Sequence, residues 1–318
     1  MTLAVETRVG PSGDRAELCA TSGAHRNLVI VRAGRRSLHT GWLDGASPAE
    51  FDLLVASYEA GAPEVRHKQA YAVNSSGPKI AGYADLFRRH PELLERYDYI
   101  ALFDDDIRIA RADIERLFRI GRQYGLDLFQ PALSHDSYFS YAATLVHRNF
   151  RLRFTNTVEM MCPVFSAAHL RRALPLFDLG YETGIDLLWT RLTDDPWRRF
   201  AIVDDVVATH TRPVGARKDL QGFRHDEPYE EQMQAALTRF GVTFRGFVSY
   251  AGIDREGRAV SSRRWIAMHS VVNWAAVLGT PLHKLDFALL ATDFTRHCLF
   301  RPVDFRRIDV AAERGGSH

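Results

Sequence analysis

The chain has 318 residues, of which 46% are hydrophobic and 25% are charged, a composition that suits one large α/β domain or two smaller ones. Lysine and arginine outnumber the acids by only 41 to 39, so the charge gives no reason to expect a nucleic-acid partner. The three cysteines lie far apart, which argues against a disulfide framework or a cysteine-rich zinc site.

The first 25 residues are predicted to be a flexible leader. Charged residues interrupt them repeatedly, and they contain no apolar core of the length that a secretory signal needs. No stretch of the chain approaches the roughly 20 continuous apolar residues of a membrane span. With the sparse cysteines, these features predict a cytoplasmic protein without a transmembrane segment.

Strands and helices are predicted to alternate along the first half of the chain. Apolar runs without polar alternation indicate buried strands, and apolar residues at helical spacing indicate helices. Gly125 is a predicted C-cap. The predicted strands span 27–34, 51–58, 66–73, 97–103 and 126–133, and the predicted helices span 79–90 and 111–125. This alternation predicts an α/β fold with a mostly parallel central sheet flanked by helices.

The second half of the chain is less regular. Residues 155–177 predict a strand and then a helix that Ser166 caps. A helix is predicted over 184–192 and a strand within 200–215. Residues 221–318 are predicted to form a mainly helical C-terminal extension packed on the same domain.

Three consecutive carboxylates, Asp104, Asp105 and Asp106, directly follow the predicted strand 97–103. Like charges this close repel unless a cation or a cationic partner joins them, so the strand is expected to end at a site. The alternative is a solvated turn or a helix N-cap, because aspartate favours both positions.

Two enzyme classes place an acidic D-x-D at the end of a parallel strand. In haloacid-dehalogenase-like phosphatases one aspartate attacks phosphorus, whereas in metal-dependent glycosyltransferases the carboxylates hold a divalent cation on the diphosphate of a nucleotide sugar. Residues 27–90 supply a preceding half-sheet that can hold a nucleotide, which favours the transferase. The phosphatase stays open as an alternative because "IVDDVV" (202–207) can mimic its later acidic pair.

The order of the sequence blocks carries a family resemblance. The blocks are "NLVIVRAG", "FDLLV", "YDYIALFDDDI", "TNTVEMMCPVFS", "GIDLLW" and "IVDDVVATHTRPVG". In this order they resemble domain-of-unknown-function family 707, which is similar in turn to GT-A glycosyltransferases. The resemblance implies that residues 26–220 form a GT-A-like, Rossmann-like domain that binds a nucleotide sugar and a metal. The implied reaction moves a sugar from a nucleoside diphosphate donor, with a UDP-sugar favoured, to a small-molecule or glycan acceptor hydroxyl. An inverting outcome is weakly favoured.

The resemblance implies a metal site of Asp104, Asp106 and His210. In the GT-A pattern the last acid reaches the metal, and the first lies near the ribose or makes a second metal contact. Asp105 is assigned to the donor side with Asp104, although alternation along an extended backbone points neighbouring side chains to opposite sides. His210 resembles the late histidine that completes the cation's shell; its alternative is a structural hydrogen bond. Mn²⁺ or Mg²⁺ is the expected cofactor, and imidazole suits manganese better.

Four further residues are predicted to contact the donor. Arg32 and Gly34 follow the first strand, where a uracil or diphosphate would lie, and glycine permits close backbone approach. Lys79 and Gly82 begin a predicted helix whose N-terminus can meet a phosphate. An ordinary strand-to-loop turn explains the first pair equally well, and a solvated first helical turn explains the second.

The predicted acceptor side consists of three acids. Asp186 is the candidate general base, because an inverting transfer needs a carboxylate facing the acceptor hydroxyl. Glu182, four positions earlier, is a second catalytic candidate on the same helical face. Both can instead be helix N-terminal charges that satisfy free amides. Glu159 lies between apolar neighbours and is expected to grip acceptor hydroxyls or to anchor an internal arginine. A non-catalytic nucleotide-sugar-binding protein is the alternative function.

Overall fold

The computed structural model describes residues 26–213, 229–274 and 287–310, so the predicted leader lies outside the described residues. The described strands are β1 (Asn27–Ala33), β2 (Asp52–Ser57), β3 (Ala70–Asn74), β4 (Tyr99–Asp104), β5 (Ile107–Arg108), β6 (Leu128–Leu133), β7 (Phe150–Thr155), β8 (Val164–Ser166), β9 (Phe200–His210), β10 (Ser249–Asp254) and β11 (Ala259–Val260). The described α-helices are α1 (Lys79–Arg89), α2 (Leu93–Arg96), α3 (Arg111–Tyr124), α4 (Ala167–Phe177), α5 (Tyr229–Arg239), α6 (Arg263–Trp274) and α7 (Phe287–Phe300). Short 3₁₀ turns are η1 (His39–Gly41), η2 (Ala142–Thr144), η3 (Ile185–Leu187) and η4 (Trp189–Arg191).

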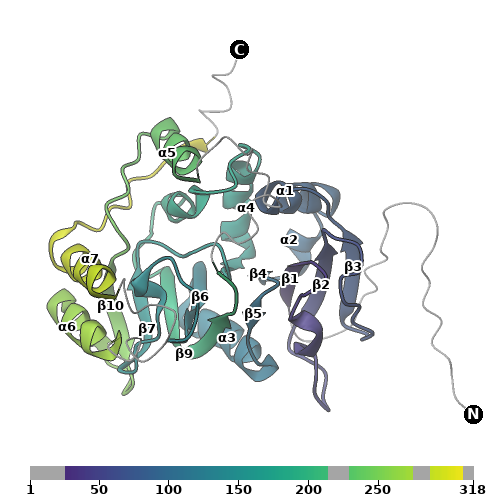
Figure 1. Cartoon of the computed structure of the whole chain (residues 1–318), viewed down its shortest axis with the longest axis horizontal. Helices are drawn as coiled ribbons and strands as arrows, with labels where there is room; N and C mark the ends of the chain where they lie inside the picture. Colours follow the sequence, from purple (N-terminus) through teal and green to yellow (C-terminus); the bar gives the residue numbers. More distant parts are fainter. Residues whose placement is uncertain (1–25, 214–228, 275–286, 311–318) are drawn as a thin grey trace, which may run out of the picture.

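One large sheet runs through the molecule in the order β11-β10-β7-β9-β6-β8-β4-β1-β2-β3 (Figure 1). Strands β3, β2, β1 and β4 pair in parallel, and so do β6 and β9. The short β8 is antiparallel to both of its neighbours, so β4 and β6 run in the same direction. The predicted α/β fold with helices flanking a central sheet is therefore confirmed. The carboxyl ends of β1, β4 and β9 meet along one edge.

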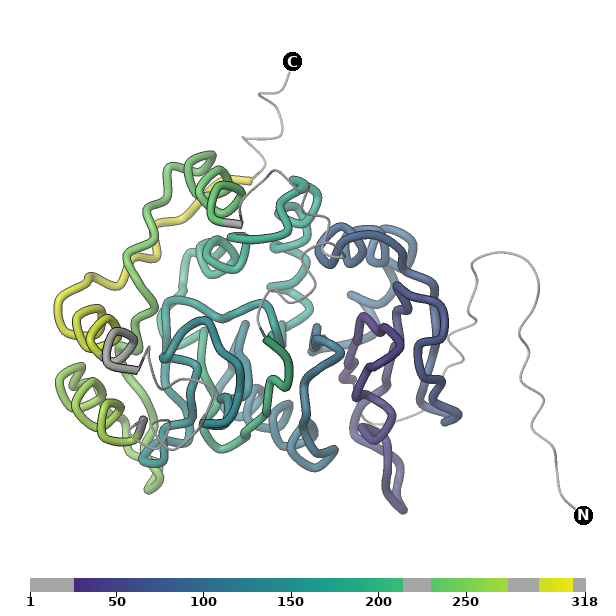
Figure 2. Tube along the Cα trace, viewed as in Figure 1, coloured from purple at the N-terminus to yellow at the C-terminus, as the bar shows by residue number. Residues whose placement is uncertain are grey.

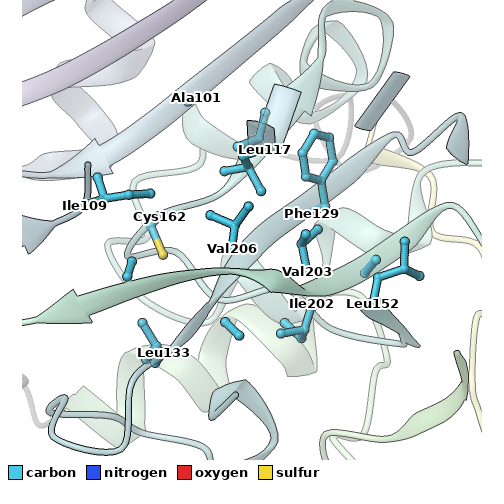
Figure 3. Close-up of a cluster of buried hydrophobic side chains, with 14 of the residues drawn as sticks. Ala101, Ile109, Leu117, Phe129, Leu133, Leu152, Cys162, Ile202, Val203 and Val206 are labelled. Carbon is cyan, nitrogen blue, oxygen red and sulfur yellow. The ribbon is translucent and has the colours of Figure 1, made fainter. Parts of the chain in front are cut away.

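Helices cover both faces of the sheet, which explains the uninterrupted apolar strands. In β1, Val29 and Val31 belong to one buried cluster while Leu28 and Ile30 belong to another. The first cluster includes residues of α3 and of β6 and β9, and Figure 3 shows part of it. The second cluster packs beneath α1, α2 and α4. Alternate residues of one strand therefore supply two cores.

The predicted end signals of two helices are confirmed. Gly125 closes α3 in the left-handed region at φ 60°, and its N–H donates to the carbonyl oxygens of Arg122 and Gly121. The hydroxyl of Ser166 accepts the N–H of His169 at 3.2 Å and caps α4. Both signals act within one helical turn, which is why sequence alone locates them.

The segment predicted as a helix over 184–192 forms only η3 and η4, so that prediction is wrong. Side chains in this segment form hydrogen bonds with the backbone of the loop before β8, and the segment does not form a continuous helix. The indole N–H of Trp189 donates to Val158 O at 3.0 Å, and the hydroxyl of Thr190 donates to Asn156 O at 2.8 Å. Tertiary hydrogen bonds have overridden local helical spacing here.

The C-terminal region contributes to the sheet as well as to the helical layer. Strands β10 and β11 extend the sheet beyond β7, beside helices α6 and α7. After α7 the chain returns toward α5, as the Cα trace in Figure 2 shows, and Ile308 N–H donates to Arg191 O at 3.1 Å. None of the helices in the described ranges combines the length and apolar character that crossing a membrane requires.

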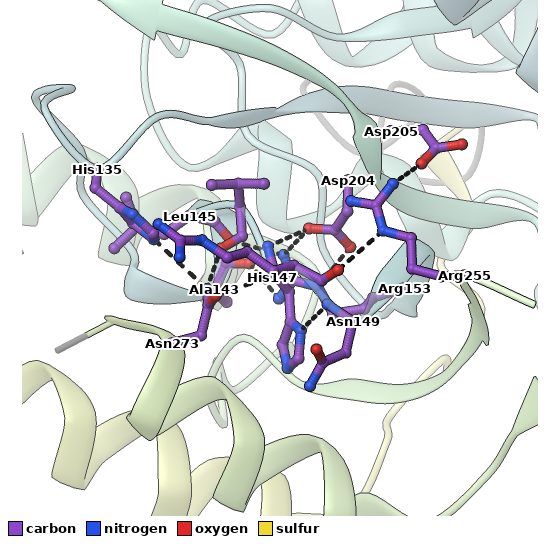
Figure 4. Close-up of polar contacts among 12 residues, drawn as sticks. His135, Ala143, Leu145, His147, Asn149, Arg153, Asp204, Asp205, Arg255 and Asn273 are labelled. Carbon is purple, nitrogen blue, oxygen red and sulfur yellow. Dashed lines mark hydrogen bonds and ion pairs between the residues drawn. The ribbon is translucent and has the colours of Figure 1, made fainter. Parts of the chain in front are cut away.

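A fully buried ion pair joins β7 to β9 (Figure 4). Both side chains, Arg153 and Asp204, are 0% exposed, and two guanidinium nitrogens donate to the carboxylate at 2.9 Å. In addition, Nη1 donates to Ala143 O and Nη2 donates to Leu145 O. Because both charged groups are buried and paired with each other, we interpret the ion pair as a structural link between the two strands and not as a reactive centre.

Candidate functional site

Each of the three consecutive aspartates forms an ion pair with a cation from elsewhere in the chain. One cation is the first residue of α1, and the other two follow each other closely at the end of β9. The pairs are Asp104 with Lys79 at 2.5 Å, Asp105 with Arg212 at 3.0 Å, and Asp106 with His210 at 3.3 Å. Like-charge repulsion among the acids is thereby relieved inside the protein.

The short strand β5 brings His210 to the acids. It follows the aspartates directly and pairs antiparallel with the end of β9, with Ile107 opposite His210. The Thr211 N–H and hydroxyl both donate to Asp106 O, at 3.1 and 2.9 Å. The imidazole Nδ1 lies 3.0 Å from Tyr138 O, which orients Nε2 toward Asp106.

Asp104, Asp106 and His210 have the geometry of a metal-ion site. One ligand atom from each lies within 4.8 Å of the others. Asp106 Oδ1 is buried and lies 3.3 Å from His210 Nε2, and no other group among the described residues hydrogen-bonds to it, so it retains capacity for a cation. Two carboxylates and an imidazole suit Mn²⁺, with Mg²⁺ less well matched to the nitrogen ligand. The residues present therefore fit the predicted cation.

Burial and pairing push the pKa values of this cluster in different directions. Burial raises the pKa of Asp104 to about 6, partly offset by Lys79. Burial also opposes ionisation of Asp106, but its hydrogen bond and charge interaction with His210 outweigh this and lower the pKa. Burial lowers the His210 pKa, and Asp106 more than reverses that effect. Asp106 therefore favours the protonated form of His210, in which the imidazolium is a counterion for the carboxylate.

A pH dependence follows from the raised His210 pKa. Its contribution to stability is present below the unfolded value of 6.5 and is lost as pH rises through the higher folded value. In chelator, the stability advantage of wild type over His210→Gln should shrink between about pH 6 and about pH 9. Urea unfolding at both pH values measures this difference. Parallel pH profiles for the two proteins would show that the pair does not titrate as described.

Asp105 connects three segments instead of joining the metal cluster. Its Oδ2 accepts the Gly34 N–H at 2.9 Å and the Tyr58 hydroxyl at 3.1 Å, while Oδ1 accepts Arg212. A side chain at Gly34 would place its Cβ 2.5 Å from the Tyr58 hydroxyl oxygen. Gly34 therefore permits close contact within the protein here, and its predicted donor contact stays a prediction.

The N-terminus of α1 is held by Glu182. Its two carboxylate oxygens accept the N–H groups of Ile80 and Ala81 at 2.7 and 2.9 Å. These bonds satisfy amides that a helix start leaves free, which is the structural alternative considered for this acid. Burial raises the pKa of Glu182, and the two amides partly offset it. Glu182 thereby fixes the position of Lys79.

Arg32 and Gly82 pack against each other beneath α1. The Arg32 guanidinium donates to Ser75 O at 2.9 Å and to Gly77 O at 2.7 Å, and its side chain is buried. A Cβ at Gly82 would lie 1.1 Å from Arg32 Nη1, so only glycine leaves room for the guanidinium. This packing accounts for both residue types without a ligand, and their predicted donor contacts stay predictions.

Two buried acids, Asp186 and Glu159, interact electrostatically with Lys79. Burial raises the pKa of Asp186 to about 6 and that of Glu159 to about 7, and Lys79 lowers both. The charge of Asp186 further raises the pKa of Glu159. Glu159 Oε2 has no hydrogen-bond partner among the described residues, and this acid anchors no arginine there. Glu159 therefore retains an oxygen that is available for a ligand.

Sequence reasoning missed two residues of the site. Arg212 pairs with Asp105 and also donates to Arg36 O, and Tyr138 supplies the carbonyl that orients His210. Arg212 was detectable, because it stands two positions after His210 and ends the same polar run. Tyr138 acts only through its backbone, and no sequence pattern marks such a contact.

The two acids of the "IVDDVV" segment, Asp204 and Asp205, form ion pairs with arginines. Asp204 binds the buried Arg153, and Asp205 pairs with Arg116 and Arg255. Arg116 donates to Asp205 at 2.9 Å. Neither aspartate belongs to the group formed by Asp104, Asp106 and His210, so this acidic pair lends the phosphatase alternative no support.

One protein-family model matches the chain. The family model described as "Protein of unknown function (DUF707)" matches residues 68–247, more than half of the chain. The chain belongs to the DUF707 family. The DUF707 match contains Lys79, the three aspartates and His210, whereas β1 and β2 precede it. Among curated proteins, none matches the sequence.

Several solved structures resemble the DUF707 chain at low identity. S. aureus TarS 1–349 in complex with UDP-GlcNAc is 11% identical, with a TM-score of 0.39 over 87% of this chain and 74% of that one. The same TarS fragment without that ligand in its description gives a TM-score of 0.40 at 11% identity, over 87% and 73%. A197 from STIV is 10% identical, with a TM-score of 0.34 over 74% and 94%. All three TM-scores lie below 0.5, a level of likeness that identifies no function.

Proposed function

We propose that this protein is a metal-dependent glycosyltransferase that moves a sugar from a nucleoside diphosphate sugar, with UDP the favoured nucleotide, to an acceptor hydroxyl. The observation that carries the proposal is the cluster of Asp104, Asp106 and His210, whose ligand atoms lie within 4.8 Å of one another. The cluster lies where strands β4 and β9 end, the edge at which open α/β sheets bind ligands.

The charge around the cluster supports an anionic donor. Lys79 lies at the start of α1 and places an ammonium beside Asp104, whereas the amides of Ile80 and Ala81 already bind Glu182. A bound divalent cation would neutralise the diphosphate and stabilise it as the leaving group. With the acids already paired inside the protein, added positive charge from a cation is what would make this edge attractive to a diphosphate.

Asp186 is the proposed general base. A base with a pKa of about 6 is ionised near neutral pH and still accepts a proton as the acceptor oxygen attacks. In the balanced step, the acceptor oxygen bonds to the anomeric carbon, the bond from that carbon to the diphosphate oxygen breaks, and the hydroxyl proton passes to Asp186. Glu159 would hold another acceptor hydroxyl through its unpaired oxygen.

A thermal-shift experiment tests the donor and cation together. UDP is expected to raise the melting temperature with Mn²⁺ present and to leave it unchanged in excess chelator, because without the cation the diphosphate faces Asp104 and Asp106. UMP and GDP serve as controls for the diphosphate and for the base. Equal stabilisation by UDP in chelator would remove the metal-bridged arrangement. Stabilisation without turnover against a broad acceptor panel would favour the non-catalytic binding protein.

A further inference from the structure

Lys79 is paired with Asp104, one of the three candidate metal ligands. Its Nζ lies 2.5 Å from Asp104 Oδ1 and also donates to Met160 O at 2.7 Å. The lysine side chain is only 14% exposed. An ammonium held by a carboxylate and a carbonyl in a sheltered place is a stronger pairing than an exposed surface salt bridge.

The position of Lys79 is fixed by the helix that it begins. Glu182 binds the next two backbone amides, those of Ile80 and Ala81, and so anchors the first turn of α1. Only the side chain of Lys79 is left to move, and a lysine stem has four rotatable bonds. The ammonium can therefore leave Asp104 while the backbone stays in place.

A bound metal ion would affect the three cations that pair with the aspartates in different ways. The Arg212–Asp105 pair lies outside the cluster, so it can persist. His210 already offers an imidazole nitrogen to the cluster, so it can stay in place as a ligand. The Lys79 ammonium is a donor with no acceptor atom, so it cannot serve as a ligand. Among the cations paired with these aspartates, it alone must be displaced.

We propose that Lys79 is a tethered cation that neutralises Asp104 in the metal-free protein and competes with the divalent cation for that carboxylate. The inference rests on the proposed metal site. A divalent ion on Asp104 would lie close to the ammonium whichever carboxylate oxygen it used, and the two positive charges repel. Metal binding therefore carries the cost of separating Lys79 from Asp104. Lys79 is a positioning residue in this role.

Calorimetric titration with Mn²⁺ alone tests the competition without nucleotide, acceptor or turnover. In one buffer at constant pH, Lys79→Met should lower the Kd for Mn²⁺ by about tenfold or more. Lys79→Gln removes the same charge while keeping a donor for Met160 O, and it should tighten binding in the same direction. Lys68→Met is the matched control, because Lys68 is exposed and should leave the Kd unchanged.

The possible results separate this inference from the proposed function. Tighter Mn²⁺ binding in either folded Lys79 variant, with the Lys68 control unchanged, supports the competition. Equal or weaker binding in both variants, with wild type binding one Mn²⁺, overturns the role of Lys79 and leaves the metal site standing. If neither wild type nor the variants bind Mn²⁺, the metal-dependent function and the competition both fall. Circular dichroism verifies that each variant is folded.

Discussion

Asp186→Asn is expected to bind Mn²⁺ and UDP as wild type does and to lose transfer by roughly 10²–10⁴-fold, the usual contribution of a positioned general base. Asparagine has nearly the same shape but accepts no proton at neutral pH. The residue is buried in η3 and is not one of the three residues of the metal cluster. Titrations with Mn²⁺ and UDP measure the expected unchanged binding, and single-turnover rates measure the expected loss of transfer.

Two further variants test whether Asp186 is the general base. Glu159→Gln should raise the acceptor KM more than it lowers kcat, because that acid is proposed to hold and not to deprotonate the acceptor. Asp194→Asn, at an exposed acid, should change neither constant. The product of direct attack has an inverted anomeric centre. NMR that shows retained configuration, or near-normal turnover of Asp186→Asn, would rule out Asp186 as the base.

Asp106→Ala is expected to abolish cation-dependent nucleotide binding. The variant removes one of the three residues of the cluster, which leaves Asp104 and His210 as the remaining ligands. Two ligands do not hold a divalent ion against water as three do. The Thr211 bonds to Asp106 use its backbone oxygen, so the loop retains them in the variant. Mn²⁺ calorimetry and UDP thermal shift measure the loss.

The stability of this variant also reports on the site. From the sequence alone, removal of one of three adjacent acids should relieve repulsion and leave the metal-free melting temperature equal or higher. The structure reverses that expectation, because Asp106 is paired with His210 and its pKa is lowered. Loss of a hydrogen bond to a charged group costs about 1.5–3 kcal/mol of unfolding free energy. Asp44→Ala, at an exposed acid, is the control. Unchanged UDP affinity in a destabilised Asp106→Ala protein would make the acids a structural cap.

The sequence by itself located most strands and helices of the first half of the chain and the acids at the end of one strand. Apolar runs located the buried strands, and the caps at Gly125 and Ser166 fixed two helix ends, since these signals act over a few residues. The acids after β4 and the histidine ending β9 also lie where the sequence predicted, because strand ends are visible as a change from apolar to polar residues.

Only the tertiary structure decided which partner each charged residue has. Asp105 and Arg212 stand 107 positions apart, and Glu182 caps a helix that begins more than a hundred positions before it. The sequence predicted Lys79 to meet a phosphate and left Glu182 either as a catalytic acid or as a helix charge, whereas the fold places Lys79 on Asp104 and Glu182 on the amides of α1. Charge pairing is set by which strand ends and loops meet along the sheet edge. That meeting depends on strand order, which local propensity and periodicity do not encode.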